Sequence, residues 1–347
     1  MTSPRLTARI VVPEAMSAGD VAAWDDLCAS VAELRSAFYT HAFALAASRA
    51  GYRVRVAILE DGSGIVGFFP FQFRHRLAES LGLAERVGEE MSDYFGVIAK
   101  PTARLTAADL LAACRLNCCY FTHLDGWQAG IGLTGEQPEP SPRIEIPSDI
   151  EEYWKKIKKR DNKFAAGTRR SERKMEEEFG KLHFEFQSVD RMSDLKYLIS
   201  LKRKQYIKTT DDDLLSYRHR QQLLANLVDI DSQGCKGVLS VLRAGAEVAA
   251  LHFGLQCHDV LHYWFPVYNP ALKAHAPGRL LLSRLIAASH EEGFRMIDLG
   301  AGDSQAKRKL ANGRVDVYRG LWSRHAPARF AGRALAFFQW RLGVPFM

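Results

Sequence analysis

Three consecutive β-patterned segments followed by a helix restrict the possible folds of the C-terminal half more than any other feature. Residues 236–245, 246–258 and 259–270 are rich in Val, Leu and aromatic side chains and are separated by short turns, which predicts an antiparallel meander. A loop, a helix over 278–293 and a strand over 295–299 follow. This order predicts an α/β domain of the α+β type, built on a largely antiparallel sheet.

The start of that helix is suited to bind an anion. It opens on Pro277 and Gly278, and the first N–H groups of a helix have no acceptor within the helix. These amides and the helix dipole favour a pyrophosphate, and Gly278 has no side chain that would block its approach. Arg279 could pair with the phosphate. A Pro-Gly pair often marks only a turn, so the prediction depends on the surrounding order of elements.

The strand pattern places histidines and aromatic side chains beside this helix. Alternation puts His252 on a face with small residues. A hairpin turn at 257–259 would bring Trp264 opposite His252, with His262, Trp264 and Tyr268 on one face. These side chains could line a substrate site, although a histidine in a strand is often only structural.

Acidic and basic residues follow the strand over 295–299. Asp298 and Asp303 flank a glycine cluster, where a carboxylate could accept the proton of an amine or orient a substrate. Capping of the next turn is an equally good role for such an aspartate. Lys307 and Lys309 could meet phosphates or an anionic acceptor, or lie in solvent. Because no G-x-S-x-G motif is present, we expect any group transfer at this site to proceed by direct attack without a covalent intermediate.

The 347 residues suffice for two domains, and a Pro-, Ser- and Glu-rich segment over 134–149 reads as the linker between them. We therefore predict domains over 1–145 and 146–347. Both contain helix, hairpin and further strand in a similar order, which allows a duplicated fold. In the first domain, residues 53–60 and 65–76 flank an Asp-Gly turn and predict a hairpin.

Composition limits the class of protein further. No apolar run approaches the length of a membrane span and no signal peptide is evident, so we expect a cytoplasmic protein without a membrane span. The six cysteines have no regular spacing, which predicts reduced, buried thiols and no metal site. An amphipathic helix over 329–343 is expected to pack onto the protein.

Most of the net charge of +7 comes from one segment. Residues 155–174 contain ten Lys or Arg and two acidic residues, within a helical region over 150–180 that we expect to break near Gly167. Three interpretations remain open: binding of phosphates on a small molecule, binding of a nucleic acid, and a solvated helix face. Few aromatic residues interleave with the charges, which disfavours base stacking.

Several of these segments together resemble the GNAT acyltransferases around their coenzyme A site. The resemblance lies in PGRLLLSRLIAASHEEG, IDLGAGD, Lys307, Lys309 and AGTRRSERK, with IVGFFPFQ and SDYFG in the N-terminal half. It is similar in particular to the CelD/BcsL-like branch of cellulose and exopolysaccharide biosynthesis, which is akin to the Fem aminoacyl-transferases. The usual phosphate loop of the family has more glycines than LKAHAPGR.

The resemblance implies tandem GNAT-like domains, each a mixed, largely antiparallel sheet flanked by helices, with the coenzyme A site in the second. It implies acetyl-CoA or another acyl-CoA as co-substrate and no metal. We assign catalytic roles to His252, Asp298 and Asp303. Contacts to the acyl-CoA are assigned to Phe265, Val267, Ala276, Pro277, Gly278, Arg279, Leu280 and Lys307. Contacts to the acceptor are assigned to Asp93, Tyr94, Arg169, Arg170, His262 and Trp264.

The expected activity is acyl-CoA-dependent N-acyl transfer to a small-molecule amine. The resemblance implies an amino sugar or a nucleotide-linked sugar for a surface polysaccharide as acceptor. One alternative is a Fem-like transferase that uses aminoacyl-tRNA. Another is a module of a polysaccharide-synthesis complex that kept the fold without the activity.

Overall fold

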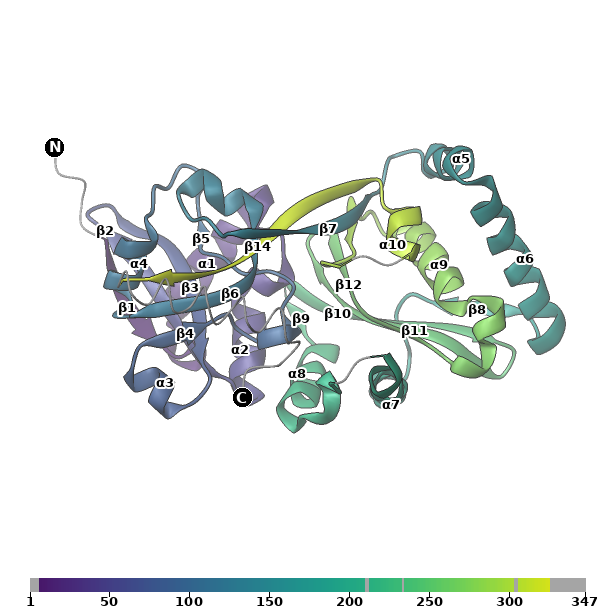
Figure 1. Ribbon diagram of the computed structural model, residues 1–347, viewed down its shortest axis with the longest axis horizontal. Helices are drawn as coiled ribbons and strands as arrows, with labels where there is room; N and C mark the ends of the chain where they lie inside the picture. Colours follow the sequence, from purple (N-terminus) through teal and green to yellow (C-terminus); the bar gives the residue numbers. More distant parts are fainter. Residues whose placement is uncertain (1–5, 210–211, 233, 303–304, 325–347) are drawn as a thin grey trace. The chain divides into compact units, whose positions relative to one another are not determined.

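The computed structural model describes residues 6–209, 212–232, 234–302 and 305–324, without the side chains of residues 305 and 306. They form two compact units, each described here by itself (Figure 1). Unit 1 contains the residues up to Leu34, Phe38–Glu139 and the chain from Asp316, whereas unit 2 contains Arg35–Ala37 and Pro140–Val315. The chain passes from unit 1 to unit 2 within β7 (Gln137–Glu145) and returns within β14 (Gly313–Ser323). The expected domain pair 1–145 and 146–347 did not include this return.

Unit 1 is a mixed sheet with helices on both faces. Its strand order is β1-β2-β3-β4-β6-β14, with β5 beside β3, and only β4 and β6 pair in parallel. The strands are β1 (Thr7–Val11), β2 (Arg53–Asp61), β3 (Gly64–Phe73), β4 (Leu83–Glu85), β5 (Ile98–Ala99) and β6 (Cys118–Asp125). The helices are α1 (Ala18–Ser30), α2 (His41–Arg49), α3 (Arg76–Ser80) and α4 (Ala107–Ala113). The predicted hairpin is confirmed as β2 and β3.

The central strand β3 of unit 1 is covered on both faces of the sheet, and its aromatic residues pack alternately against one face and the other. Phe68 stacks on Trp24 of α1 at 4.9 Å, whereas Phe69 packs in the opposite cluster with Leu110 and Leu111 of α4. This arrangement explains the continuous apolar run in β3, since a strand covered on both faces has no solvent side.

The segment predicted as a linker, 134–149, does contain the change from unit 1 to unit 2, but the change lies within the strand β7 and not in an irregular linker. Pro138, Pro140 and Pro142 occupy every second position of the strand. Successive N–H groups of a strand point to opposite sides, so the three missing donors all fall on one side. Beyond the last proline, β7 pairs with β13 (Met296–Asp298) through Arg143, Ile144 and Glu145.

Unit 2 has the strand order β7-β13-β12-β11-β10-β8, with β9 beside β10, and only β12 and β13 pair in parallel. Its strands are β8 (Leu182–Glu185), β9 (Asp231–Ser232), β10 (Cys235–Ala244), β11 (Glu247–Cys257), β12 (Val260–Tyr268) and β13 (Met296–Asp298). Its helices are α5 (Ile150–Arg160), α6 (Asn162–Phe179), α7 (Arg191–Thr209), α8 (Arg218–Val228), α9 (Pro277–Glu291) and α10 (Gln305–Leu310). Each unit is thus a mixed, mostly antiparallel sheet flanked by helices, as predicted.

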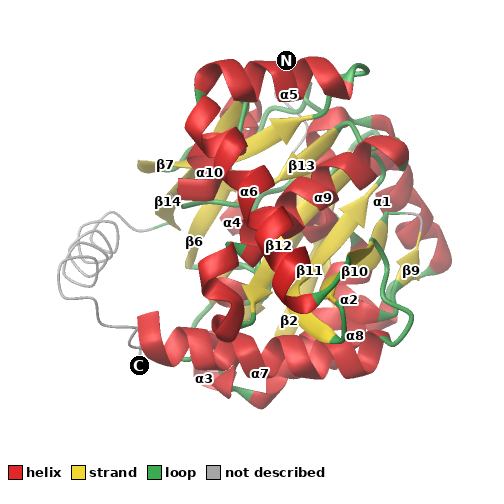
Figure 2. Cartoon of the chain, turned by 90° about the vertical axis from the view of Figure 1, so that its right-hand side faces the viewer, coloured by secondary structure: helices red, strands yellow, loops and turns green. Residues whose placement is uncertain are grey.

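Helices cover both faces of the unit 2 sheet (Figures 1 and 2). On one face, Leu282 and Leu285 of α9 pack against Leu261 and Tyr263 of β12, together with Ile157 of α5. The other face is covered by α7, which packs on β10, β11 and β12, and by α8, which packs on β10. These two layers hold α7 and α9 beside the strand β12.

The basic helical region breaks at Asp161 and not near Gly167, which lies inside α6. The Asp161 carboxylate accepts a hydrogen bond from the N–H of Phe164 at 2.8 Å and so caps α6. The helix predicted over 329–343 lies outside the described residues. Among the residues that the structure describes, no helix combines the length and apolar character needed to cross a bilayer.

Candidate active site

The start of α9 presents one backbone amide to a ligand. Ala276 precedes the helix with a left-handed conformation at φ 51°, and Pro277 has no N–H. The N–H groups of Arg279 and Leu280 both donate to the Ala276 carbonyl, at 3.0 and 3.3 Å. Among the described residues this leaves the Gly278 N–H without an acceptor. A methyl group at Gly278 would meet only the Tyr268 ring, at 3.7 Å, so protein packing alone does not demand a glycine there.

The Arg279 side chain interacts with α6. Its Nη2 donates to the Gly167 carbonyl at 3.2 Å and to Ser171 Oγ at 3.0 Å, and its guanidinium lies 5.2 Å from the centre of the Phe164 ring. Burial lowers the pKa of this guanidinium. These contacts use Arg279 to fix α6 against α9, which competes with its expected role in phosphate binding.

Strand β12 has a free edge next to this helix. It pairs with β13 through Val260, Leu261 and His262 only, and β13 then ends at Asp298. Over Tyr263–Tyr268, β12 pairs with β11 on one side, and no described strand pairs with it on the other. We call Tyr263–Tyr268 the free edge of β12. Backbone groups at such an edge can bind an extended ligand that carries amides.

His252 is completely buried under this part of the sheet. Its ring stacks on Tyr263 at 4.5 Å, and within the described part of the chain neither ring nitrogen makes a hydrogen bond. Burial lowers its pKa from 6.5 to about 3, so the imidazole is neutral at physiological pH. A base with so low a pKa is a poor proton acceptor at pH 7.

The expected pairing of His252 with Trp264 was wrong, because the strands shift register. Phe253 pairs with Phe265 but Leu255 pairs with His262, which gives β12 an extra residue in a bulge. His252 therefore lies opposite Pro266 and not beside Trp264. The bulge also separates His262 from Tyr268, because their partners Leu255 and Ala250 point to opposite faces of β11.

His262 and Asp298 lie side by side at the point where β12 and β13 separate. They are register partners in the parallel pair, and both are buried. His262 Nε2 accepts a hydrogen bond from the Ala37 N–H at 3.4 Å, and Asp298 Oδ1 accepts one from the Gly300 N–H at 2.8 Å. Burial lowers the pKa of His262, and the Asp298 carboxylate opposes that shift. A carboxylate beside an imidazole is a suitable arrangement for accepting a proton.

Two lysines lie near the free edge of β12, and the sequence analysis missed one of them. Lys307 Nζ donates to the carbonyls of Gly300 and Ala301, at 3.0 and 2.8 Å. Lys202 of α7 is buried, and its Nζ donates to the Pro266 carbonyl at 2.9 Å. Helical spacing places Lys202 next to Leu201 and four residues after Leu198, both of which are buried, a weak signal that it faces the sheet.

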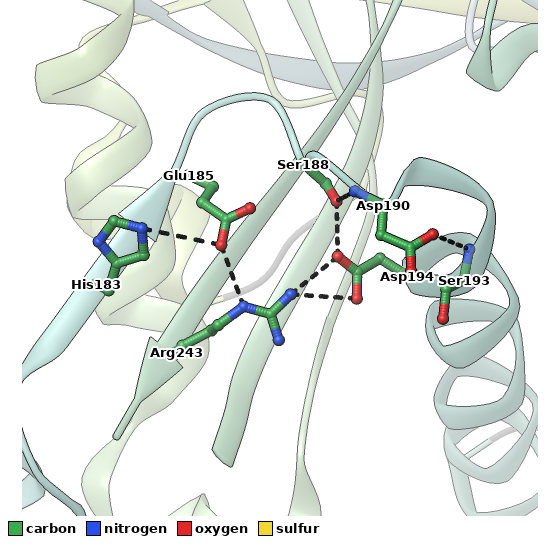
Figure 3. Close-up of polar contacts among 7 residues, drawn as sticks. All are labelled: His183, Glu185, Ser188, Asp190, Ser193, Asp194 and Arg243. Atoms are coloured by element: carbon green, nitrogen blue, oxygen red, sulfur yellow. Dashed lines mark hydrogen bonds and ion pairs between the residues drawn. The ribbon is translucent and has the colours of Figure 1, made fainter. Parts of the chain in front are cut away.

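A polar cluster fixes the start of α7 to the sheet (Figure 3). Arg243 of β10 donates from Nε to Glu185 of β8 at 3.1 Å and from Nη2 to Asp194 of α7 at 3.1 Å. Ser188 Oγ donates to the same Asp194 carboxylate at 2.7 Å. The cluster sets the position of α7, and hence of Lys202, relative to the strands.

The predicted acceptor residues Arg169 and Arg170 are exposed on α6 and form no ion pair among the described residues. Arg169 lines a cavity of about 430 Å³ with apolar walls that include Trp154, Ile157 and Phe164. This cavity lies between α5, α6 and α9, within unit 2.

Comparison with known proteins gives a family match for part of the chain. Residues 162–308 match the sequence profile of the family described as acetyltransferase (GNAT) domain. The match supports an acyltransferase. It extends from the start of α6 into α10 and so contains His252, the free edge of β12, Gly278 and Lys307. No curated protein sequence matches the chain.

Solved structures with the same fold cover nearly the whole chain. FemX is 9% identical with a TM-score of 0.58, over 93% of this chain and 99% of FemX. The C-terminal domain of a protein assigned as a lysylphosphatidylglycerol synthetase from Agrobacterium fabrum is 14% identical with a TM-score of 0.55, over 92% and 95%. A conserved protein of unknown function from Bacteroides thetaiotaomicron is 10% identical with a TM-score of 0.53, over 86% and 96%. At these identities the likeness shows the fold alone.

The remaining predicted residues are divided among several places. Phe265, Val267 and Leu280 are buried in unit 2, and Trp264 is half-buried beside Phe265. Asp303 lies outside the described residues.

In unit 1, Tyr94 is buried beside Tyr39, with 6.4 Å between ring centres. Asp93 is half-buried and acts electrostatically on the buried Arg86. The role of this pair in substrate binding stays a prediction.

Proposed function

We propose that the chain transfers an acyl group from an acyl-CoA thioester to the nitrogen of an amine, at the free edge of β12 in unit 2. The observation that carries this proposal is the position of the unpaired Gly278 N–H beside that edge, within the segment that matches the GNAT profile. The amide and the positive end of α9 suit a phosphate, while the edge suits the amide groups of a pantetheine arm.

Direct transfer needs three things from the protein. The amine must be neutral when its nitrogen attacks the thioester carbonyl, the carbon–sulfur bond must break so that coenzyme A leaves as a thiolate and takes up a proton, and the amine must lose one proton. Asp298 with His262 is our preferred proton acceptor, because the pair lies where β12 and β13 separate. Asp303 remains a second candidate. His252 is better suited to hold Tyr263 in place, since its ring is buried and its pKa is low.

The acceptor that we favour is an amino sugar or a nucleotide-linked sugar of a surface polysaccharide. The support is the sequence resemblance to the CelD/BcsL-like branch, together with the exposed Arg169 beside the cavity between α5, α6 and α9. An arginine fork binds phosphate oxygens well, which suits a sugar that carries a phosphate.

A second candidate donor is aminoacyl-tRNA. It is favoured by the fold shared with FemX and by the cations of α5 and α6. Lys158, Lys159, Lys163, Arg169, Arg170 and Lys174 have no ion-pair partner among the described residues. One free amide at α9 also offers less to a pyrophosphate than a full phosphate loop would.

Calorimetric titration with acetyl-CoA tests the preferred donor. We expect binding to the wild-type protein, near-normal binding to Gly278→Asn, and at least tenfold weaker binding to Gly278→Asp. The two side chains have the same shape and differ in charge, so the difference isolates repulsion of the phosphate. Absence of binding to the wild-type protein contradicts the acyl-CoA proposal. Binding of tRNA that falls steeply with salt would then favour the second donor.

A further inference from the structure

Lys202 is a buried cation without a matching anion. Only 9% of the residue is exposed, and its ammonium donates to the neutral Pro266 carbonyl. The ring of Tyr206 lies 5.3 Å from Nζ. An ammonium group has three donors, and in the described part of the chain no carboxylate lies within ion-pair distance of this one. Neither a carbonyl nor a ring offsets a full charge.

A second cation lies close to the first. Lys307 approaches from α10, and its two described hydrogen bonds go to the carbonyl oxygens of Gly300 and Ala301. Burial, and to a lesser extent the charge of Lys307, together lower the pKa of Lys202 to about 8. Two like charges held near each other at low dielectric raise each other's energy, and an anion bound beside both would remove that cost.

The backbone beside the two lysines is open to a ligand on one side. The Pro266 carbonyl belongs to the free edge of β12, and Pro266 has no N–H to offer there. Residues 264, 266 and 268 of this strand are only half-buried, although Phe265 and Val267 between them are buried. A ligand at this edge therefore meets a carbonyl oxygen and two ammonium groups.

We propose that Lys202 and Lys307 together bind one anionic oxygen group, a carboxylate or a phosphate, of a substrate at the free edge of β12. The inference rests on the proposed function only in placing a substrate at that edge. The anion comes either from the acyl donor, as a phosphate, or from the acceptor, as a phosphate or carboxylate.

The pKa of Lys202, compared with and without an added anion, tests anion binding directly. Carbon-13 spectra of labelled lysine side chains, assigned with Lys202→Met, give its pKa in the wild-type protein. Lys307 and the ring of Tyr206 are the titratable groups that face it. At constant ionic strength, pyrophosphate and acetate should each be tested, and at least one should raise the pKa of Lys202 by one unit or more. Lys204, exposed on the same helix, should not respond. No response of Lys202 to either anion overturns the proposal.

Paired probes identify the source of the anion. Acetyl-CoA is compared with the phosphate-free thioester of N-acetylcysteamine, and glucosamine 6-phosphate with glucosamine. If the anion belongs to the donor, Lys202→Met weakens acetyl-CoA binding at least tenfold and leaves the small thioester unchanged. If the anion belongs to the acceptor, Lys202→Met weakens binding of glucosamine 6-phosphate at least tenfold and leaves binding of glucosamine unchanged.

Two further variants separate charge from structure. Lys202→Arg keeps the cation and should retain most of the affinity for the phosphate-bearing probe, whereas Lys204→Met should change nothing. Equal losses in the Arg and Met variants would contradict anion binding. The outcome is independent of the donor question: if acetyl-CoA fails to bind while pyrophosphate raises the pKa of Lys202, the proposed donor is wrong and the anion site stands.

Discussion

The buried His252 predicts that the folded protein loses stability in mild acid. Its imidazole is completely buried and stacks on Tyr263, and the backbone of His262 only partly offsets the cost of placing a proton there. The folded-state pKa is about 3, compared with 6.5 for an exposed histidine. The unfolded chain therefore binds a proton at a pH where the folded chain does not.

The sign and size follow from proton linkage. Well above pH 6.5 His252 is mostly deprotonated in both states, so the residue contributes little pH dependence there. As the pH falls from 6.5 towards 3, the unfolded state gains protons and is favoured by about 1.4 kcal/mol per pH unit. At pH 5 the expected loss in the free energy of unfolding is therefore ~2 kcal/mol from this histidine alone.

Urea unfolding at pH 7 and pH 5, for the wild-type protein and for His252→Phe, measures this loss. Phenylalanine keeps an aromatic ring against Tyr263, and any constant packing cost cancels in the comparison between the two pH values. The variant should lose ~2 kcal/mol less than the wild type on acidification, while the exposed His183→Phe should behave like the wild type. His262, which is also buried, keeps part of the pH dependence in all three proteins. An equal loss in wild type and His252→Phe would refute the burial argument.

Three other predictions concern packing, polar contacts and thiols. Gly237→Ala should destabilise the protein by about 2 kcal/mol or more, because the added methyl group would lie 2.3 Å from the Leu227 carbonyl oxygen. Gly130→Ala serves as the control, because a methyl group there would have no neighbouring atom within 4 Å. Arg243→Met should lower the free energy of unfolding in urea by about 1–3 kcal/mol, because Glu185 and Asp194 both lose their arginine partner. The exposed Arg173→Met should lower it by less than about 0.5 kcal/mol. In the native protein Cys118 should react first with a thiol reagent at pH 8, although partial burial raises its pKa, because the other five cysteines are buried. Rapid labelling of several thiols would contradict that last prediction.

Local pattern was sufficient to predict the main elements of the site. The meander and the helix that begins at Pro277 are found where apolar alternation and the Pro-Gly pair placed them. The β2–β3 hairpin follows from an Asp-Gly turn between β-rich segments. These signals work because strand and helix periods and turn chemistry act over a few residues.

The errors arose where distant parts of the chain decide the outcome. The bulge in β12 changes which side chains meet across the hairpin, and no residue type in that strand announces it. The prolines of β7 suggested a linker, although their spacing by two is compatible with a strand. Lys202 was not singled out from the sequence, since its burial depends on α7 packing against β12.

The passage of the chain through β7 and β14 has a consequence for biosynthesis. Strand β14 pairs with β6 and delivers Trp322 to the core of unit 1, yet it is translated after all of unit 2. On the ribosome, the first part of the chain must wait with one edge of β6 unpaired and an incomplete core until the rest has emerged. A fragment that stops at Glu139 would be left permanently in that unfinished state, with an exposed sheet edge that favours aggregation.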